Sequence, residues 1–134
     1  MKTVLIADDV SFVRKALRGL LEARGYRVVG EAASGTEAIE LYRVLQPTFV
    51  TMDLVMPGMN GVQATKTLLS EYPEARVIVV SSMGQEELIA DAIRAGAREY
   101  VSKPFRETEL HSAIEFALSD ETRKVPSEGP LQAC

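Results

Sequence analysis

Cysteine and histidine are almost missing from this sequence, and each near-absence excludes a class of site. Among 134 residues there is one cysteine, Cys134, and one histidine, His111. One cysteine cannot form a disulfide within the chain, which is typical of a protein from a reducing compartment. With no second histidine or cysteine to accompany His111, a zinc site is not expected.

Long apolar runs and excess positive charge are also missing. The N-terminal stretch MKTVLIADD has one lysine and an apolar run that is too short for a signal peptide. No stretch has the roughly 20 apolar residues that are needed to span a bilayer. The net charge is −4, which does not favour a nucleic-acid surface. We therefore expect a cytoplasmic protein that neither binds nucleic acid nor inserts into a membrane.

Strand-like and helix-like patterns alternate along most of the chain. Short runs rich in β-branched residues are followed by stretches in which apolar residues recur every three or four positions. Such alternation with short connections predicts a parallel sheet, right-handed crossovers and helices on both faces. The expected strands are 3–7, 27–32, 48–52, 76–80 and 99–102, and the first four following helices are ended by Gly25, Pro47, Pro73 and Gly96.

The alternating pattern stops near residue 119. The remaining stretch, DETRKVPSEGPLQAC, contains two prolines and few apolar residues. We expect one domain over 1–119 and a disordered C-terminal tail over 120–134.

Polar residues follow four of the expected strands. Asp8 and Asp9 follow the first, Asp53 the third, Ser81 the fourth and Lys103 the fifth. Ligands of open parallel sheets bind outside the carboxyl ends of the strands, so these side chains are expected on one rim. Three carboxylates repel one another unless cations compensate them, and Lys103 supplies only one positive charge. An all-oxygen site then favours Mg²⁺ as the second cation.

Each of these residues has a plainer interpretation when it is taken alone. Asp8 or Asp9 could be the N-cap of the following helix, and Asp53 could cap the turn before the next Pro-Gly pair. Ser82 has capping-box spacing with the glutamine three residues later, so it is expected to be structural. Lys103 alone would be a solvated surface lysine. Convergence on one rim favours a joint site.

Four motifs occur in order: VLIADD, TMDLVMPGMNG, VIVVSSMGQ and YVSKPF. Together they resemble the response-regulator receiver domain of two-component signalling, over about residues 2–119. Within that family the chain is most similar to single-domain CheY-type chemotaxis regulators. The resemblance implies an α/β, flavodoxin-like (βα)5 three-layer sandwich. Its five-stranded parallel sheet would have the order 2-1-3-4-5, as known for CheY and flavodoxin.

The resemblance also implies roles for the matched residues in phosphorylation. Asp53 would accept a phosphoryl group from a phosphohistidine. Lys103 would form an ion pair with that group, and Ser81 would donate a hydrogen bond to it. Tyr100 would be an aromatic switch whose rotamer follows Ser81. The Lys103–Pro104 peptide would be cis.

For the metal, the resemblance implies four oxygen donors. Asp9 would bind Mg²⁺ directly and Asp8 largely through water, together with Asp53 and the backbone carbonyl of Val55. Val55 itself is apolar where much of the family has a polar side chain, and Met83 is also apolar. We expect both residues to slow the spontaneous loss of phosphate.

The implied function is a phosphorylation-activated signalling switch that catalyses only its own phosphorylation and dephosphorylation. The expected partners are a CheA-like sensor histidine kinase, a downstream protein such as the flagellar motor switch, and a phosphatase. The output surface would lie within 85–118, and the chain would be a monomer. The alternatives are a receiver domain cut from a multidomain response regulator, a phosphate sink or a phosphorelay receiver.

Two other classes of protein fit the sequence less well. A haloacid-dehalogenase-type phosphotransferase would have Asp-x-Asp after its first strand, whereas Asp8 and Asp9 are adjacent. A flavodoxin would have a hydroxyl-rich loop there, and DDVSF is not one. His111 lies between apolar positions of the last helix, so it is expected to be an exposed structural residue and not a phosphorelay histidine.

Overall fold

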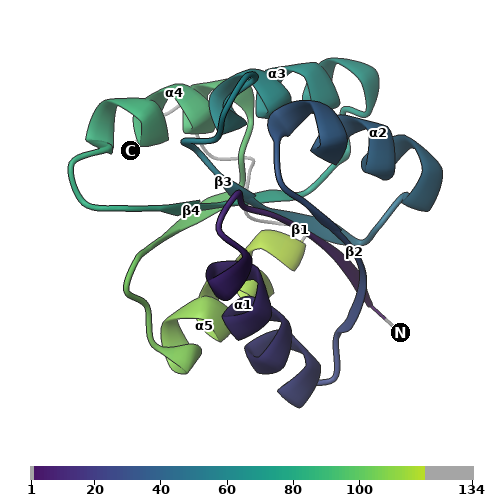
Figure 1. Ribbon diagram of the computed structural model, residues 1–134, viewed down its shortest axis with the longest axis vertical. Helices are drawn as coiled ribbons and strands as arrows, with labels where there is room; N and C mark the ends of the chain where they lie inside the picture. The colour runs from purple at the N-terminus through teal and green to yellow at the C-terminus, as the bar shows by residue number, and fades with distance from the viewer. Residues whose placement is uncertain (1, 120–134) are drawn as a thin grey trace.

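The computed structural model describes residues 2–119, so the expectation of a disordered tail falls outside the described range. The described chain forms three layers, with a parallel sheet of order β2-β1-β3-β4-β5 between two layers of helices (Figure 1). This is the predicted flavodoxin-like fold. The strands are β1 (Thr3–Ala7), β2 (Arg27–Ala32), β3 (Phe49–Asp53), β4 (Val77–Ser81) and β5 (Glu99–Ser102). The helices are α1 (Ser11–Ala23), α2 (Gly35–Leu45), α3 (Gly61–Glu71), α4 (Glu86–Ala95) and α5 (Glu107–Leu118).

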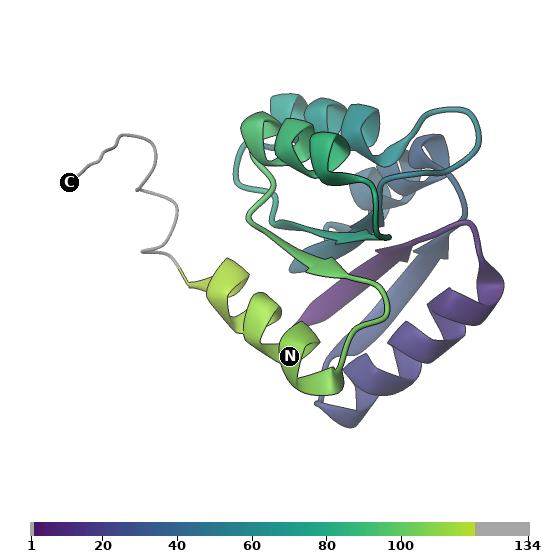
Figure 2. The same ribbon diagram turned by 90° about the vertical axis from the view of Figure 1, so that its left-hand side faces the viewer.

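The two faces of the sheet carry separate cores because successive strand residues point to opposite sides. Leu5, Val50 and Met52 belong to the core beneath α2, α3 and α4. Ile6 and Phe49 belong to the core beneath α1 and α5. Figure 2 shows the sheet edge-on between the two helix layers. β3 and β4 are buried at every position because they have strands on both sides and helices on both faces.

β3 and β4 each run one residue later than the sequence predicted. Asp53 pairs with Val80, and Ser81 pairs with Ser102, so both polar residues belong to the ladder and not to the loops that follow. Neighbouring strands decide this register, and a single-strand pattern does not contain that information. As strand residues, Asp53 and Ser81 have backbones that the sheet holds in place.

Local chemistry accounts for the start of α3, the end of α4 and part of the start of α2. Asn60 caps α3 in a complete capping box, and Gly96 ends α4 with φ of 116°. At α2 the Ser34 side chain accepts from the Glu37 N–H, as expected. The Glu37 carboxylate, however, accepts from the N–H of Ala33 at 2.8 Å, so the expected box is only half formed. Among the described residues, no helix is long and apolar enough to cross a membrane.

Candidate functional site

Three carboxylates meet at the carboxyl edge of the sheet. Asp8 and Asp9 follow β1, and Asp53 ends β3, the neighbouring parallel strand. One carboxylate oxygen from each residue lies within 4.8 Å of the others. Asp8 and Asp53 are buried, whereas Asp9 is exposed. The sequence-predicted rim is therefore an acidic cluster with one side open to solvent.

Lys103 provides a positive charge next to this cluster. Its Nζ lies 2.9 Å from Asp8 Oδ2 and 3.5 Å from Asp53 Oδ1. The Lys103–Pro104 peptide is cis, as the resemblance implied, and the Lys103 N–H donates to the Ser81 carbonyl at 2.6 Å. Lys103 is thus a half-buried ion-pair partner and not a solvated surface lysine.

Asp8 is held by hydrogen bonds and does not cap α1. Its Oδ1 accepts from the Val10 N–H at 2.9 Å, and its own N–H donates to the Ala32 carbonyl at 2.9 Å. The N-cap residue of α1 is Val10, which has no side-chain cap hydrogen bond. The plainer interpretation of Asp8 or Asp9 as a helix cap is therefore wrong.

Burial and repulsion make Asp53 hard to ionise in the metal-free protein. Burial is the largest cause that raises its pKa, from 3.8 to about 6, and the Asp8 carboxylate adds to the rise. The Lys103 ammonium opposes both effects only in part. For Lys103, burial lowers the pKa, but the bond to Asp8 and the charge of Asp53 outweigh it and raise the pKa above 10.5. The site is short of positive charge, which is what a divalent cation would supply.

Ser81 brings a buried hydroxyl to the same edge. Its side chain is fully buried at the end of β4, and its Oγ has no hydrogen-bond partner within the described part of the chain. Buried polar atoms are usually paired, so an unpaired one requires an explanation. A hydroxyl without a partner, a lysine and three hard carboxylates fit Mg²⁺ together with an oxyanion.

The other residues singled out in the sequence lie around this centre. Tyr100 on β5 is 47% exposed and lines a groove of about 690 Å³ between β5 and α5. Val55 and Met83, in the loops after β3 and β4, are also exposed. None of these positions tests the roles that the resemblance implied for the side chains.

Two sequence expectations about individual residues are corrected by the structure. The capping box expected at Ser82 is only half formed. The Gln85 side chain accepts from the Ser82 N–H, but α4 begins at Glu86 with Gln85, not Ser82, as its N-cap residue. His111 is half-buried and not exposed, since α5 turns its side of the helix toward α1, and its Nε2 lies 3.1 Å from Glu115 Oε2.

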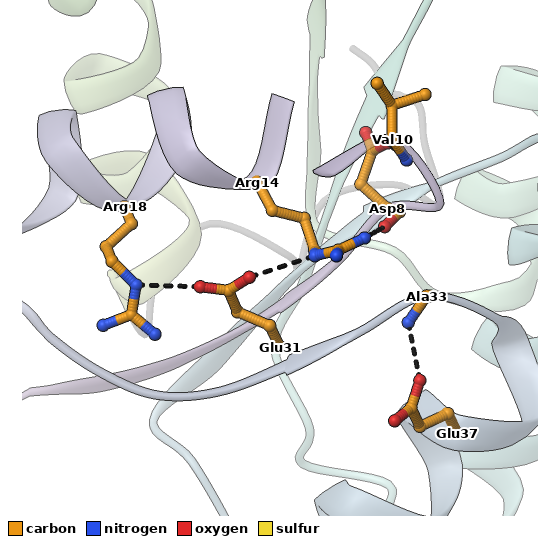
Figure 3. A network of polar contacts seen from close by, with 7 residues as sticks. All are labelled: Asp8, Val10, Arg14, Arg18, Glu31, Ala33 and Glu37. Atoms are coloured by element: carbon orange, nitrogen blue, oxygen red, sulfur yellow. Dashed lines mark hydrogen bonds and ion pairs between the residues drawn. The ribbon is translucent and has the colours of Figure 1, made fainter. Parts of the chain in front are cut away.

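Sequence reasoning also missed a residue that contacts the acidic loop. The Arg14 guanidinium, on α1, donates to the backbone carbonyl of Asp8 at 2.6 Å (Figure 3). Its place in the first turn of α1, five residues after Asp9, was the available signal. The backbone contact itself depends on how α1 packs on the sheet.

Comparisons with known proteins agree with this geometry. The family profile described as "Response regulator receiver domain" matches residues 4–115. The chain is similar to the chemotaxis protein CheY of Thermotoga maritima, with 44% identity over 113 residues that cover 84% of this chain and 94% of that protein.

Similarity extends to a longer protein and to a solved complex. Protein-glutamate methylesterase/protein-glutamine glutaminase 5 of Myxococcus xanthus is 48% identical over 103 residues, which cover 75% of this chain and 30% of that protein. A chain in the crystal structure of the CheX–CheY–BeF3–Mg²⁺ complex from Borrelia burgdorferi has a TM-score of 0.80 and 30% identity, covering 84% of this chain and 86% of that one.

Proposed function

This chain belongs to the response regulator receiver family, and from that premise we propose that it is a signalling switch phosphorylated on Asp53. The observation that carries the proposal is the position of Asp53. It ends a central strand, is buried, and shares its surroundings with two other carboxylates and Lys103. A structural acid would not need this surplus of negative charge.

The residues that would hold Mg²⁺ are Asp8, Asp9, Asp53 and the backbone carbonyl of Val55. Bound Mg²⁺ supplies positive charge that neutralises the transferred phosphoryl group. The three carboxylates support this assignment because they offer hard oxygens within 4.8 Å of one another. Asp9 is the exposed member and leaves the site accessible from solvent.

The chain's own residues would do the rest by position and charge. An oxygen of the ionised Asp53 carboxylate attacks phosphorus as the bond to the donor's histidine nitrogen breaks. The Lys103 ammonium pairs with a phosphoryl oxygen, and the Ser81 hydroxyl, unpaired among the described residues, donates to another. Two charge-assisted contacts contribute roughly 3–6 kcal/mol. This approaches the roughly 5.5 kcal/mol that inverts a 1:99 equilibrium.

Chemotaxis is the signalling context that the relatives favour. The Thermotoga maritima relative is a chemotaxis protein, and the Borrelia burgdorferi complex joins CheY to CheX in the presence of BeF3 and Mg²⁺. We propose a CheA-like histidine kinase as donor, a motor-switch-type protein as downstream partner and a phosphatase as the third. Three further features stay predictions: that the protein is cytoplasmic, that it is a monomer, and that its domain covers residues 1–119.

A second candidate is a receiver domain cut from a multidomain protein. It is favoured by the Myxococcus xanthus relative, of which the chain spans only 30%. A phosphate sink or a phosphorelay receiver would use the same Asp53 chemistry. Phosphorylation-dependent binding to a motor-switch protein would distinguish the leading proposal from all three alternatives.

Incubation with acetyl phosphate, with and without Mg²⁺, tests the phosphorylation site directly. We expect intact mass spectrometry to show the addition of one phosphoryl group that requires Mg²⁺ and disappears in Asp53→Asn. Addition that persists in Asp53→Asn would move the site elsewhere. No addition to the wild-type protein would contradict the proposal that the cluster is a phosphorylation site.

A further inference from the structure

Arg14 joins two elements with a single guanidinium. Its Nη1 donates to the Asp8 carbonyl at 2.6 Å, and its Nε donates to Glu31 Oε1 at 3.0 Å. Figure 3 shows the side chain of Arg14 lying between these two partners. Because a guanidinium is planar with donors in a fixed fork, the two contacts together fix its orientation.

Glu31, on β2, is in turn held from its other side. Its Oε2 accepts from Arg18 Nε at 2.8 Å, and Arg18 Nη1 lies 3.0 Å from Glu22 Oε2. The Arg18 hydrogen bond is the largest effect on Glu31 and lowers its pKa against the opposing effect of burial, with Arg14 adding to the lowering. Arg14 is therefore seated against an ionised carboxylate that does not move freely.

The carbonyl that Arg14 contacts belongs to the peptide between Asp8 and Asp9. The other polar groups of Asp8 are already bonded, to Ala32, Val10 and Lys103. Asp9 is exposed, and its side chain branches from a Cα whose position the Asp8–Asp9 peptide sets. The orientation of that peptide therefore influences where the Asp9 carboxylate lies relative to Asp53.

We propose that Arg14 is a positioning residue for the metal site, acting through the Asp8–Asp9 peptide. The inference rests on the proposed function, because it assumes that the cluster binds Mg²⁺. Groups that orient metal ligands without touching the metal typically change metal affinity by about 10–100-fold when they are removed. The peptide that Arg14 contacts joins the two residues that supply two of the three carboxylates.

Charge and position predict opposite outcomes at Arg14. A cation near the cluster repels Mg²⁺, so loss of the charge alone would tighten Mg²⁺ binding. Loss of the contact to the Asp8 carbonyl would instead loosen the peptide and weaken binding. Arg14→Gln therefore separates the two explanations by the sign of the change.

The test is calorimetric titration of the unphosphorylated protein with Mg²⁺. We expect Arg14→Gln to bind about tenfold more weakly than wild type. Arg14→Lys, which keeps the charge but lacks the fork, should also bind more weakly. The matched control is Arg18→Gln, which loses a contact to the same Glu31 but none to Asp8, and it should stay within about twofold of wild type.

Each other result has a defined meaning. Binding by Arg14→Gln that equals or exceeds wild type would overturn the inference, and so would equal weakening in Arg18→Gln. Thermal melts check that each variant is folded, and Arg14→Lys carries the test if Arg14→Gln does not fold. A wild-type protein that does not bind Mg²⁺ would remove the proposed metal site and this inference with it, a failure visible without any variant.

Discussion

At the residue scale, the ionised Asp53 carboxylate that the reaction needs also destabilises the folded protein. A nucleophilic carboxylate must be ionised, yet burial and the neighbouring Asp8 raise its pKa to about 6. In the unfolded chain the same group titrates near 3.8. Between these values the folded protein binds more protons than the unfolded chain, so stability falls as pH rises through this window. Above about pH 6 Asp53 is ionised in the folded protein, and the loss of stability reaches its full size.

Asp53→Asn should therefore stabilise the metal-free protein at neutral pH. With allowance for solvent screening, we expect the free energy of unfolding at pH 7.5 to rise by about 1–2 kcal/mol. The gain should shrink as pH falls toward 4, where Asp53 is protonated in the folded protein. Thermal or urea melts in EDTA at both pH values measure it. An equal gain at both pH values would show that side-chain ionisation is not the cause.

At the scale of elements, the loop between β3 and α3 is fixed at both ends. The Met59 carbonyl accepts from the Gly35 N–H at 3.1 Å, and the Leu54 carbonyl accepts from the Gly61 N–H at 3.0 Å. A side chain at Gly61 would place its Cβ 2.0 Å from the Asp53 carbonyl oxygen, so α3 begins on a glycine. These contacts leave Val55 on an exposed part of the loop that follows Asp53.

The apolar Val55 should keep the hydrolytic water near the phosphorylated site poorly oriented. We expect Val55→Asn, whose amide can hydrogen-bond a water, to lose phosphate several-fold faster than wild type. Decay after removal of acetyl phosphate, followed by intact mass, measures the rate. Val44→Asn, the same change at another exposed valine, on α2, is the control. A rate unchanged in Val55→Asn would remove Val55 as a determinant of phosphate lifetime.

At the scale of the whole molecule, the sheet connects the acidic cluster to the surface formed by β5 and α5. Ser81 on β4 pairs with Ser102, and its carbonyl accepts from the Lys103 N–H. The same strand β5 carries Tyr100 into the groove beside α5. A change at Ser81 therefore adjoins the strand that forms the proposed output surface.

Beryllofluoride, as an analogue of the phosphoryl group, should shift amide resonances from the cluster to β5 and α5 when Mg²⁺ is present. We expect Ser81→Ala to reduce the ratio of shifted to unshifted protein by about tenfold or more, because it loses one charge-assisted contact of roughly 1.5–3 kcal/mol. Ser82→Ala, the exposed neighbouring serine, should behave like wild type. Equal effects of the two changes would remove Ser81 as the coupling residue.

The sequence alone determined the order of the secondary-structure elements, the type of sheet and the location of the site. Alternating periods predicted the order of elements and the parallel sheet, because burial on one or two faces leaves a local pattern. Parallel strands present their carboxyl ends on one edge of the sheet. This rule predicted from the sequence alone that Asp8, Asp9, Asp53 and Lys103 lie close together. The roles of these residues, by contrast, came from resemblance and stay predictions.

Tertiary structure decided whatever depends on neighbours distant in sequence. Strand register made Asp53 and Ser81 ladder residues, and the packing of α1 on the sheet set Arg14 against the Asp8 carbonyl. Packing against α1 leaves His111 only half exposed, although its sequence neighbours indicated that it would be fully exposed. A local sequence pattern indicates which residues of a segment face the core and which face solvent. Which side chain faces which is fixed only when the layers pack, because those contacts join residues that no short window contains.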